Sequence, residues 1–447
     1  MRTSLLPADF RTVWSSLPSR PLAVLALLFG GVMPIVAAIC FPTYMHQMPK
    51  PWWEWARLLE FPFVAAEIIV IQWARARGIR DLALLKELPR DVQCAALLLV
   101  VGLFTSSLMF SHAPAVSFLI SLFTLIHLRF GMVVYEVARL KQTDDLEHIL
   151  GWFIAGLLPL ALLTAWRFNF PPPATSVPGG VIEWGSALPG FINVRHFGSW
   201  TGAVAAAALA RLLFARNPAW FGWRQGAYLF AAALTIWSGT RGAIMGIAVA
   251  MAAIAILNRK LPTFRAIGVT ATLTGGACIA AWLFVPEGQG DFLLWSIGDI
   301  ADANAVSGGR LALWTATMTK WLASPLFGWG SGSTFWEVNV GWAHTQPHNV
   351  ILQFLISWGI VGAAGGLWLL GRATCAVAGF AARQRRLQPL LALLICLLSM
   401  SFIEGMLHYP RFIEPIVAVF AILLAEREQE CGRSGVSRTE LQVVQPC

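Results

Sequence analysis

Charged residues are scarce in this sequence, and their scarcity decides its broad class. Only 12% of the 447 residues are Asp, Glu, Lys or Arg, whereas 57% are hydrophobic. A soluble domain carries about 25% charged residues. The composition therefore excludes an ordinary soluble fold and predicts an all-α, polytopic membrane protein.

Tyrosine and cysteine are also rare, with 4 and 7 residues, against 21 Trp. The cysteines lie in or beside apolar runs or near the C-terminus. Their spacing matches no disulfide framework, zinc site or thiol nucleophile. Many Trp stand where apolar runs end, which is typical of the interfacial belt of a membrane protein.

Long apolar runs are what the sequence has in abundance. About 12 of them reach or approach the length of a membrane-spanning helix. The region 1–425 is predicted to be a single transmembrane domain, with a large loop at 286–349 and a polar tail at 426–447. The runs cover 21–41, 58–73, 92–110, 113–134, 149–169, 197–215, 225–239, 241–257, 266–285, 350–371, 389–407 and 411–425.

The 32 Lys and Arg are divided unequally between alternate loops. With the N-terminus inside, most of them fall on the cytoplasmic side, as the positive-inside rule requires. Both termini are therefore expected in the cytoplasm, and the loop 286–349 is expected outside. The formal net charge of +9 is then a signal of topology and gives no reason to expect a nucleic-acid partner.

Residues 310–325, within the large loop, are predicted to form one amphipathic helix. Apolar side chains recur there at three- and four-residue spacing, with Thr and Lys between them. Such a helix would lie along the boundary between membrane and water. The apolar positions are Leu311, Trp314, Met318, Trp321 and Leu322.

Three arginines on the outer side are candidate ligands for an anion. Arg195 precedes a span, Arg241 follows the Gly-containing hairpin before another, and Arg310 follows two glycines at the start of the amphipathic helix. A guanidinium binds phosphate oxygens through two N–H groups and keeps its proton. Each arginine could instead anchor a lipid headgroup. Their shared side favours a diphosphate, and Asn193 and His196, which flank Arg195, are expected to bind substrate with it.

His348 and Asn349 stand at the outer end of the run 350–371. A histidine accepts a proton near neutral pH, so His348 is predicted to be a general base. Its alternative role is that of a helix cap or an interfacial polar residue. An amide cannot act as a base, so Asn349 is expected to orient His348 or a substrate hydroxyl. Gly359 and Gly362 lie one turn apart and predict the close approach of a neighbouring helix.

Glu404 reaches the same side between the last two runs. Its carboxylate could orient His348 or an acceptor hydroxyl, or it could pair with Arg411. Asp299 and Asp302 could bind a metal, but no third ligand of suitable spacing accompanies them. We therefore expect neither a metal nor a cofactor.

Four motifs, taken in order, resemble the signature of the O-antigen ligase and polymerase superfamily. The resemblance implies a GT-C-like glycosyltransferase of the bacterial inner membrane, acting without a metal at its periplasmic face. The motifs are Asn193-Val-Arg195-His196, Ser238-Gly-Thr-Arg241-Gly-Ala243, Arg310 with Trp314 and Ser324-Pro325-Leu-Phe-Gly328-Trp-Gly330, and His348-Asn349 with Gly359 and Gly362.

The resemblance also implies the substrates. The donor would be a glycan linked to undecaprenyl diphosphate. The acceptor would be a lipid A–core sugar in a ligase, a glycan repeat in a polymerase, or a secreted protein in a protein O-oligosaccharyltransferase. The protein-modifying branch usually has an Asn-x-Pro-Asn-type element before the sixth span. Here the sequence is Asn193-Val-Arg195-His196, which favours the ligase.

A transporter of lipid-linked glycans is the non-enzymatic alternative. It would need ionisable residues near the middle of the membrane and two related halves. Glu67 and Arg129 are candidates for such residues, whereas His127 reads as a packed polar residue of a span. No symmetry between the halves is visible, so the sequence favours an enzyme surrounded by membrane lipids.

Overall fold

The structure, a computed structural model, describes residues 20–40, 61–79, 81–140, 146–170, 191, 194–216, 218–285, 309–332 and 346–433. Within these ranges the chain is helical and contains no strand, which confirms the all-α prediction. Asn193, Asp299 and Asp302 lie outside them.

The helices are α2 (Pro21–Ala26), η1 (Leu27–Val32), α3 (Met33–Cys40), α4 (Phe61–Ala76), η4 (Asp81–Ala83), α5 (Leu84–Glu87), α6 (Arg90–Thr105), η5 (Ser106–Phe110), α7 (Pro114–Leu140), α8 (Leu146–Asn169), α10 (Val194–Leu213), α11 (Trp223–Trp237), α12 (Arg241–Asn258), α13 (Phe264–Leu283), α15 (Arg310–Leu322), α16 (Val350–Arg383), α17 (Gln388–Met400), η9 (Met406–His408) and α18 (Pro410–Arg433).

Every predicted apolar run coincides with a helix or with a stack of consecutive helices. Six helices of the described ranges are long and apolar enough to cross a membrane. This supports a polytopic membrane protein, while the number of about 12 spans stays a prediction.

The C-terminal helix continues beyond its apolar run. α18 extends to Arg433, into the segment predicted as a polar tail. Glu426 pairs there with Arg386 at 2.5 Å, and the side-chain amide of Gln429 donates to the carbonyl of Ala138 at 2.9 Å. These contacts hold a polar turn in helical form after the apolar signal has ended.

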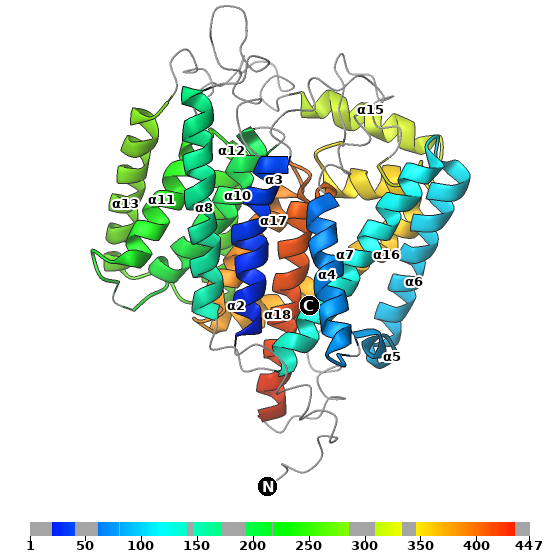
Figure 1. Ribbon diagram of the computed structural model, residues 1–447, viewed down its shortest axis with the longest axis horizontal. Coiled ribbons are helices and arrows are strands. Elements are labelled where there is room, and N and C mark those ends of the chain that lie inside the picture. Colours follow the sequence, from blue (N-terminus) through cyan, green and yellow to red (C-terminus); the bar gives the residue numbers. More distant parts are fainter. Residues whose placement is uncertain are drawn as a thin grey trace, which may run out of the picture.

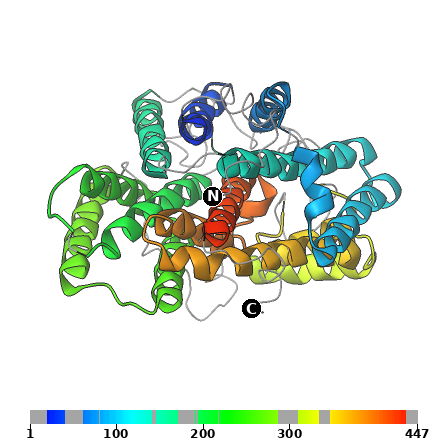
Figure 2. The ribbon, with the colours of Figure 1, turned by 90° about the horizontal axis from the view of Figure 1, so that it is seen from below.

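Two groups of helices flank a central pair. α17 and α18 lie in the middle, with α10 to α13 on one side and α4, α6, α7 and α16 on the other (Figures 1 and 2). α18 packs along α7 and also contacts α4, α16 and α17, while α10 packs against α11, α12 and α17. The central pair therefore connects the two groups.

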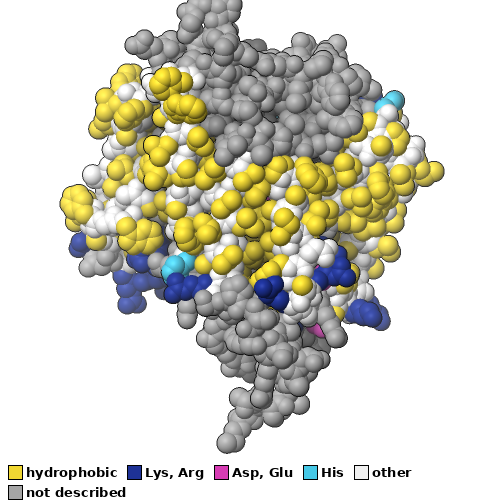
Figure 3. Space-filling model, viewed as in Figure 1, with side chains coloured by type: hydrophobic (Ala, Val, Ile, Leu, Met, Phe, Trp, Pro, Cys, Tyr) yellow, Lys and Arg dark blue, Asp and Glu magenta, His cyan; other side chains and the backbone are white. Residues whose placement is uncertain are grey.

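The visible surface separates apolar from basic side chains. Figure 3 shows a broad band of hydrophobic side chains across the molecule, with Lys and Arg gathered along its lower edge. α15 lies at the opposite end in Figure 1. This arrangement is the one that the positive-inside rule favours when α15 faces outward.

The amphipathic helix predicted at 310–325 is α15. It begins after Gly309, whose φ is 80°, and it buries Leu313 and Thr317 against the protein. Leu311, Met318 and Leu322 remain exposed. α15 thus presents part of the predicted apolar stripe to its surroundings.

The glycine pair of α16 serves two different purposes. Gly362 meets Gly102 of α6, whose Cα would lie 3.1 Å from a Cβ added at Gly362. The predicted close approach of a helix is confirmed there. For Gly359 the same prediction is wrong, because its neighbour is the main chain of Leu326 and not another helix.

α16 is broken at Gly359, where φ is 61° and ψ is −168°. The segment Ser324–Ser331, here called the return segment, runs from α15 back to this break. Its main chain satisfies carbonyl and N–H groups that the break releases, as buried backbone in a membrane protein requires. The bonds are Trp329 N to Ile356 O (2.8 Å), Gly330 N to Ser357 O (2.9 Å), Ile360 N to Pro325 O (2.9 Å) and Val361 N to Leu326 O (3.2 Å).

Candidate functional site

Several helices start at the end of the molecule where α15 lies. α10, α12, α15, α16 and α18 have their N-termini there. The starts of α12, α15 and α16 contact the turn 400–405, and the start of α10 contacts the hairpin before α12. The N-terminus of a helix carries free N–H groups and about half a positive charge. Together with arginine side chains, such starts favour the binding of an anion.

The hairpin before α12 contacts the first turn of α10. A Cβ added at Gly198 would collide with the hydroxyl oxygens of Ser238 and Thr240. The Ser238 hydroxyl in turn donates to the Thr240 hydroxyl at 2.9 Å. Arg195 and Arg241, in the first turns of α10 and α12, are both exposed. The starts of α10 and α12, which carry these two arginines, therefore lie side by side.

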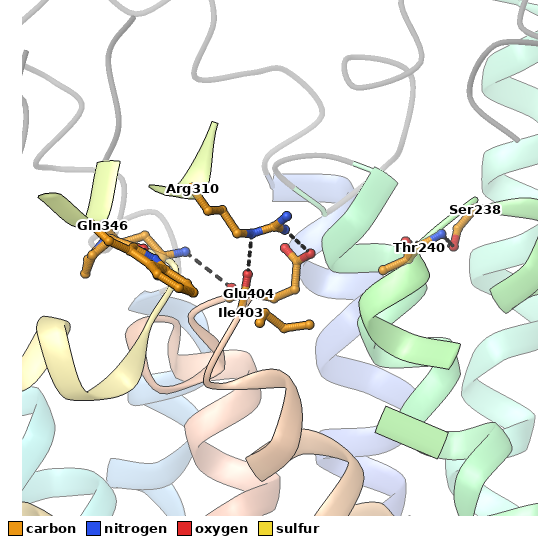
Figure 4. A network of polar contacts seen from close by, with 8 residues as sticks. Ser238, Thr240, Arg310, Gln346, Ile403 and Glu404 are labelled. Carbon is orange, nitrogen blue, oxygen red and sulfur yellow. Dashed lines mark hydrogen bonds and ion pairs between the residues drawn. The ribbon is translucent and has the colours of Figure 1, made fainter. Parts of the chain in front are cut away.

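Arg310 contacts the turn between α17 and η9 (Figure 4). Its Nη2 lies 2.5 Å from Glu404 Oε1, and its Nε donates to the carbonyl of Ile403 at 2.8 Å. The two side chains are 17% and 4% exposed, so the pair is shielded from solvent. Sequence reasoning offered His348, an acceptor hydroxyl or Arg411 to Glu404, and it missed this partner.

Glu404 also touches the start of α12. A Cβ added at Gly242 would lie 3.1 Å from Glu404 Cγ, so only glycine permits this approach without a shift. The second carboxylate oxygen, Oε2, is buried and accepts no hydrogen bond. An unsatisfied buried carboxylate oxygen is costly. Glu404 is therefore in contact with Arg310 and with the start of α12, and one of its oxygens is available to a further donor.

His348 has an unusual backbone conformation. Its φ of 54° is one of two positive values among the described non-glycine residues. A left-handed conformation costs such a residue on the order of 1 kcal/mol or more, and it persists only where the surroundings enforce it. Strain of this kind clusters at functional sites. The contacts of the next residue, Asn349, hold the main chain of His348 in this conformation.

Asn349 is the N-cap of α16. Its side-chain oxygen accepts from the N–H groups of Ile351 and Leu352 at 3.0 and 3.1 Å, and its amide nitrogen donates to Phe402 O at 3.2 Å. An N-cap contributes about 1 kcal/mol to a helix. In this structure the Asn349 amide fixes the main chain that carries His348, in line with its expected orienting role.

Two further contacts hold the residues before His348. Trp314 of α15 donates its ring N–H to the carbonyl of Pro347 at 2.9 Å, and Gln346 lies against Gly405 with its amide 3.4 Å from Glu404 O. Sequence reasoning placed Trp314 in a family motif without assigning it this contact, and it missed Gln346. The contact between α15 and the start of α16 could not be read from periodicity.

His196 occupies a different environment from Arg195. Its ring is 1% exposed and packs against Tyr409 and Phe412, with ring centres 4.5 and 5.9 Å away. The guanidinium of Arg411 lies 4.7 Å from the ring centre of Phe191. His196 thus lies beneath the exposed arginines, inside the protein.

No group of three or more His, Cys, Asp or Glu side chains in the described ranges is arranged to hold a metal ion. The cationic end of the molecule offers guanidinium, amide and hydroxyl groups, which suit a phosphate-bearing ligand.

A comparison with protein families gives one match. Residues 226–367 match the family model described as O-antigen ligase. The matched part includes Arg241, Arg310, His348 and Asn349, whereas Arg195 and Glu404 lie outside it. No curated protein matches the chain. The family match confirms the resemblance for the three motifs that lie within residues 226–367.

Proposed function

We propose that this protein, which matches the O-antigen ligase family over residues 226–367, transfers a glycan from undecaprenyl diphosphate to a sugar of lipid A–core, at the periplasmic face of the bacterial inner membrane. The observation that carries the proposal is the gathering of Arg241, Arg310 and Glu404 beside the strained His348, around one turn of chain. The arginines fit a diphosphate, and the histidine fits a base.

In the proposed reaction the acceptor hydroxyl attacks the anomeric carbon of the donor. The bond from that carbon to the diphosphate oxygen breaks, and the diphosphate leaves with the electron pair, neutralised by Arg195, Arg241 and Arg310. His348 takes the proton of the attacking hydroxyl. A single displacement inverts the anomeric centre. Holding both lipid-borne substrates at one membrane depth lowers the entropic cost of their encounter.

Glu404 supports this proposal in a second way. Its Oε1 pairs with Arg310, and its Oε2 is buried without a donor. We expect these contacts of Glu404 to change during the reaction, either when the acceptor hydroxyl approaches Glu404 or when Arg310 binds the diphosphate. Asn193, which lies outside the described residues, stays an expected substrate-binding residue. His196 stays one as well, and because it is buried we expect it to contribute indirectly, through Arg195.

The ligase proposal is tested by transfer in vitro. Purified protein in lipid is given an undecaprenyl diphosphate-linked glycan and one of three acceptors, namely lipid A–core, the lipid-linked glycan itself or a secreted protein. We expect product with lipid A–core only. Chain growth without an added acceptor would indicate a polymerase, and modified protein would indicate an O-oligosaccharyltransferase. Movement of the donor across the membrane without transfer would indicate a transporter.

Replacing Arg241 with alanine is expected to weaken donor binding. Loss of a charge-assisted phosphate contact costs about 1.5–3 kcal/mol, which corresponds to a roughly 10- to 150-fold rise in Kd for the donor. Arg241→Lys should recover little, because an ammonium group cannot form the two-pronged contact. The exposed Arg383, at the other end of α16, supplies the control Arg383→Ala. An unchanged donor Kd in Arg241→Ala would exclude the diphosphate role.

Transfer is expected to proceed without a divalent metal. Arginine side chains and helix starts would neutralise the leaving group in place of the ion. The measurement is the rate of transfer after exhaustive chelation, with and without added Mg²⁺ or Mn²⁺. A rate that falls on chelation and returns with the metal would contradict the expectation and direct attention to Asp299 and Asp302.

A further inference from the structure

Three ionisable side chains of neighbouring helices meet inside the membrane domain, away from the proposed transfer site. They are Glu67 of α4, His127 of α7 and Glu414 of α18, with exposed fractions of 0%, 2% and 2%. The proposed transfer reaction uses none of them. Ionisable residues buried in a membrane domain are expensive and usually functional.

Glu67 and His127 form a compact hydrogen-bonded pair. His127 Nδ1 lies 2.7 Å from one carboxylate oxygen of Glu67 and 2.9 Å from the other. A charged hydrogen bond of this length is among the stronger contacts available to buried groups. When the imidazole is protonated, the pair as a whole is neutral, and Glu67 needs no further cation.

Glu414 approaches this pair from α18. The guanidinium of Arg411, in the first turn of α18, lies 5.6 Å from the ring centre of Phe63 in the first turn of α4. One turn further along each helix, Glu414 lies within electrostatic range of Glu67. The Oε2 of Glu414 is buried and accepts no hydrogen bond.

The nearby cations are engaged elsewhere. Arg411 lies over the rings of Phe63 and Phe191. Arg129, two residues beyond His127 on α7, bonds to Asp81 at 2.6 Å. Among the described residues no cation forms an ion pair with Glu414. A second negative charge at this place would therefore be buried beside Glu67 without compensation, which costs several kcal/mol.

We infer that α4, α7 and α18 build a proton-binding site, in which Glu414 holds a proton at neutral pH beside the ion pair of Glu67 and His127. The site then carries no net charge, and the neutral carboxyl tolerates burial. A metal ion fits less well, since no three described His, Cys, Asp or Glu side chains are arranged to hold one.

Membrane proteins that carry protons bind them at buried ionisable side chains of this kind. Glutamate and histidine placed in series inside a helix bundle pass protons between neighbouring groups. Glu414, Glu67 and His127 are groups of this kind on three helices that pack against one another. The cations next to this set along the chain are Arg411 on α18 and Arg129 on α7, which are engaged as described above.

Infrared spectroscopy of the full chain in lipid tests the inference without relying on transfer activity. Wild-type protein at neutral pH should show the carbonyl stretching band of a protonated carboxylic acid, and the band should shift in D₂O if the proton exchanges. Glu414→Gln should remove the band. Glu404→Gln should leave it unchanged, because Glu404 is ion-paired with Arg310. His127→Ala should add a second acid band, since Glu67 would lose its cation.

A wild-type spectrum without an acid band would overturn the inference, even if no variant folds. So would a band that survives in Glu414→Gln with unchanged intensity. If the acid band is absent and Na⁺ raises thermal stability where choline does not, the site binds a monovalent cation instead of a proton. A band whose position is the same in H₂O and D₂O after prolonged incubation would contradict exchange.

Discussion

His348→Ala is expected to lower kcat by about 10²–10⁴-fold, the usual contribution of a positioned general base. Donor binding should survive, because the guanidinium groups that would hold the diphosphate belong to other helices. The measurement is single-turnover transfer at saturating donor, together with the Kd of the donor. Loss of donor affinity with an unchanged single-turnover rate would make His348 a donor ligand and leave Glu404 as the next candidate for the base.

The matched control is His112→Ala. His112 is exposed and stacks on Trp329, with ring centres 5.4 Å apart, and it has no role in the proposed reaction. Its loss removes one imidazole from the outer part of the protein while Arg310, Glu404 and His348 keep their contacts. We expect its kcat to stay within about twofold of wild type, since surface substitutions usually change stability by under about 0.5 kcal/mol.

Gly359→Ala is expected to destabilise the protein by at least about 3 kcal/mol and to abolish transfer. Two effects combine. The residue has a φ of 61°, and a Cβ added there would collide with the main chain of Leu326. The return segment could not then keep its four main-chain bonds to α16. Thermal unfolding in detergent or lipid measures the loss of stability, and the same samples give the transfer rate.

Gly371→Ala is the control within the same helix. Nothing lies within 4 Å of a Cβ added at Gly371, and alanine is favoured over glycine inside a helix by roughly 0.5–1 kcal/mol. We expect equal or slightly higher stability and unchanged transfer. Equal effects of the two substitutions would mean that the break at Gly359 has no special importance.

The helices were predictable because bilayer-length apolar runs and helical periodicity are local properties. The run 350–371 located the outer part of α16, and three- and four-residue spacing located α15 to within a turn. The Gly359 break was not predictable in this way. Glycine in an apolar helix has the same local signature whether a helix packs on it or the backbone turns there, and only the return segment distinguishes the two.

The sequence was enough to propose residues for the site, but not their contacts. Arg241 and Arg310 were selected because cations are rare on the side that is predicted to face outward. The ion pair of Arg310 with Glu404 joins residues 94 positions apart in sequence. A single sequence carries no information on which outer carboxylate meets which arginine, so the pairing with Arg411 was as reasonable as the one observed.

The broken helix determines which piece of this chain can be exchanged with a relative as a working module. Ile356 and Ser357, before the break, accept main-chain hydrogen bonds from the return segment, and Ile360 and Val361, just after it, donate two more. Pro347, the residue before His348, accepts a hydrogen bond from Trp314 of α15. The inner half is fitted to α6 through Gly362 and Gly365. A chimera that replaces the loop up to His348 would separate partners that were selected together. A junction just after Val361 keeps the loop, the return segment, its four main-chain bonds and the histidine on one transplanted unit, while the rest of α16 remains matched to α6.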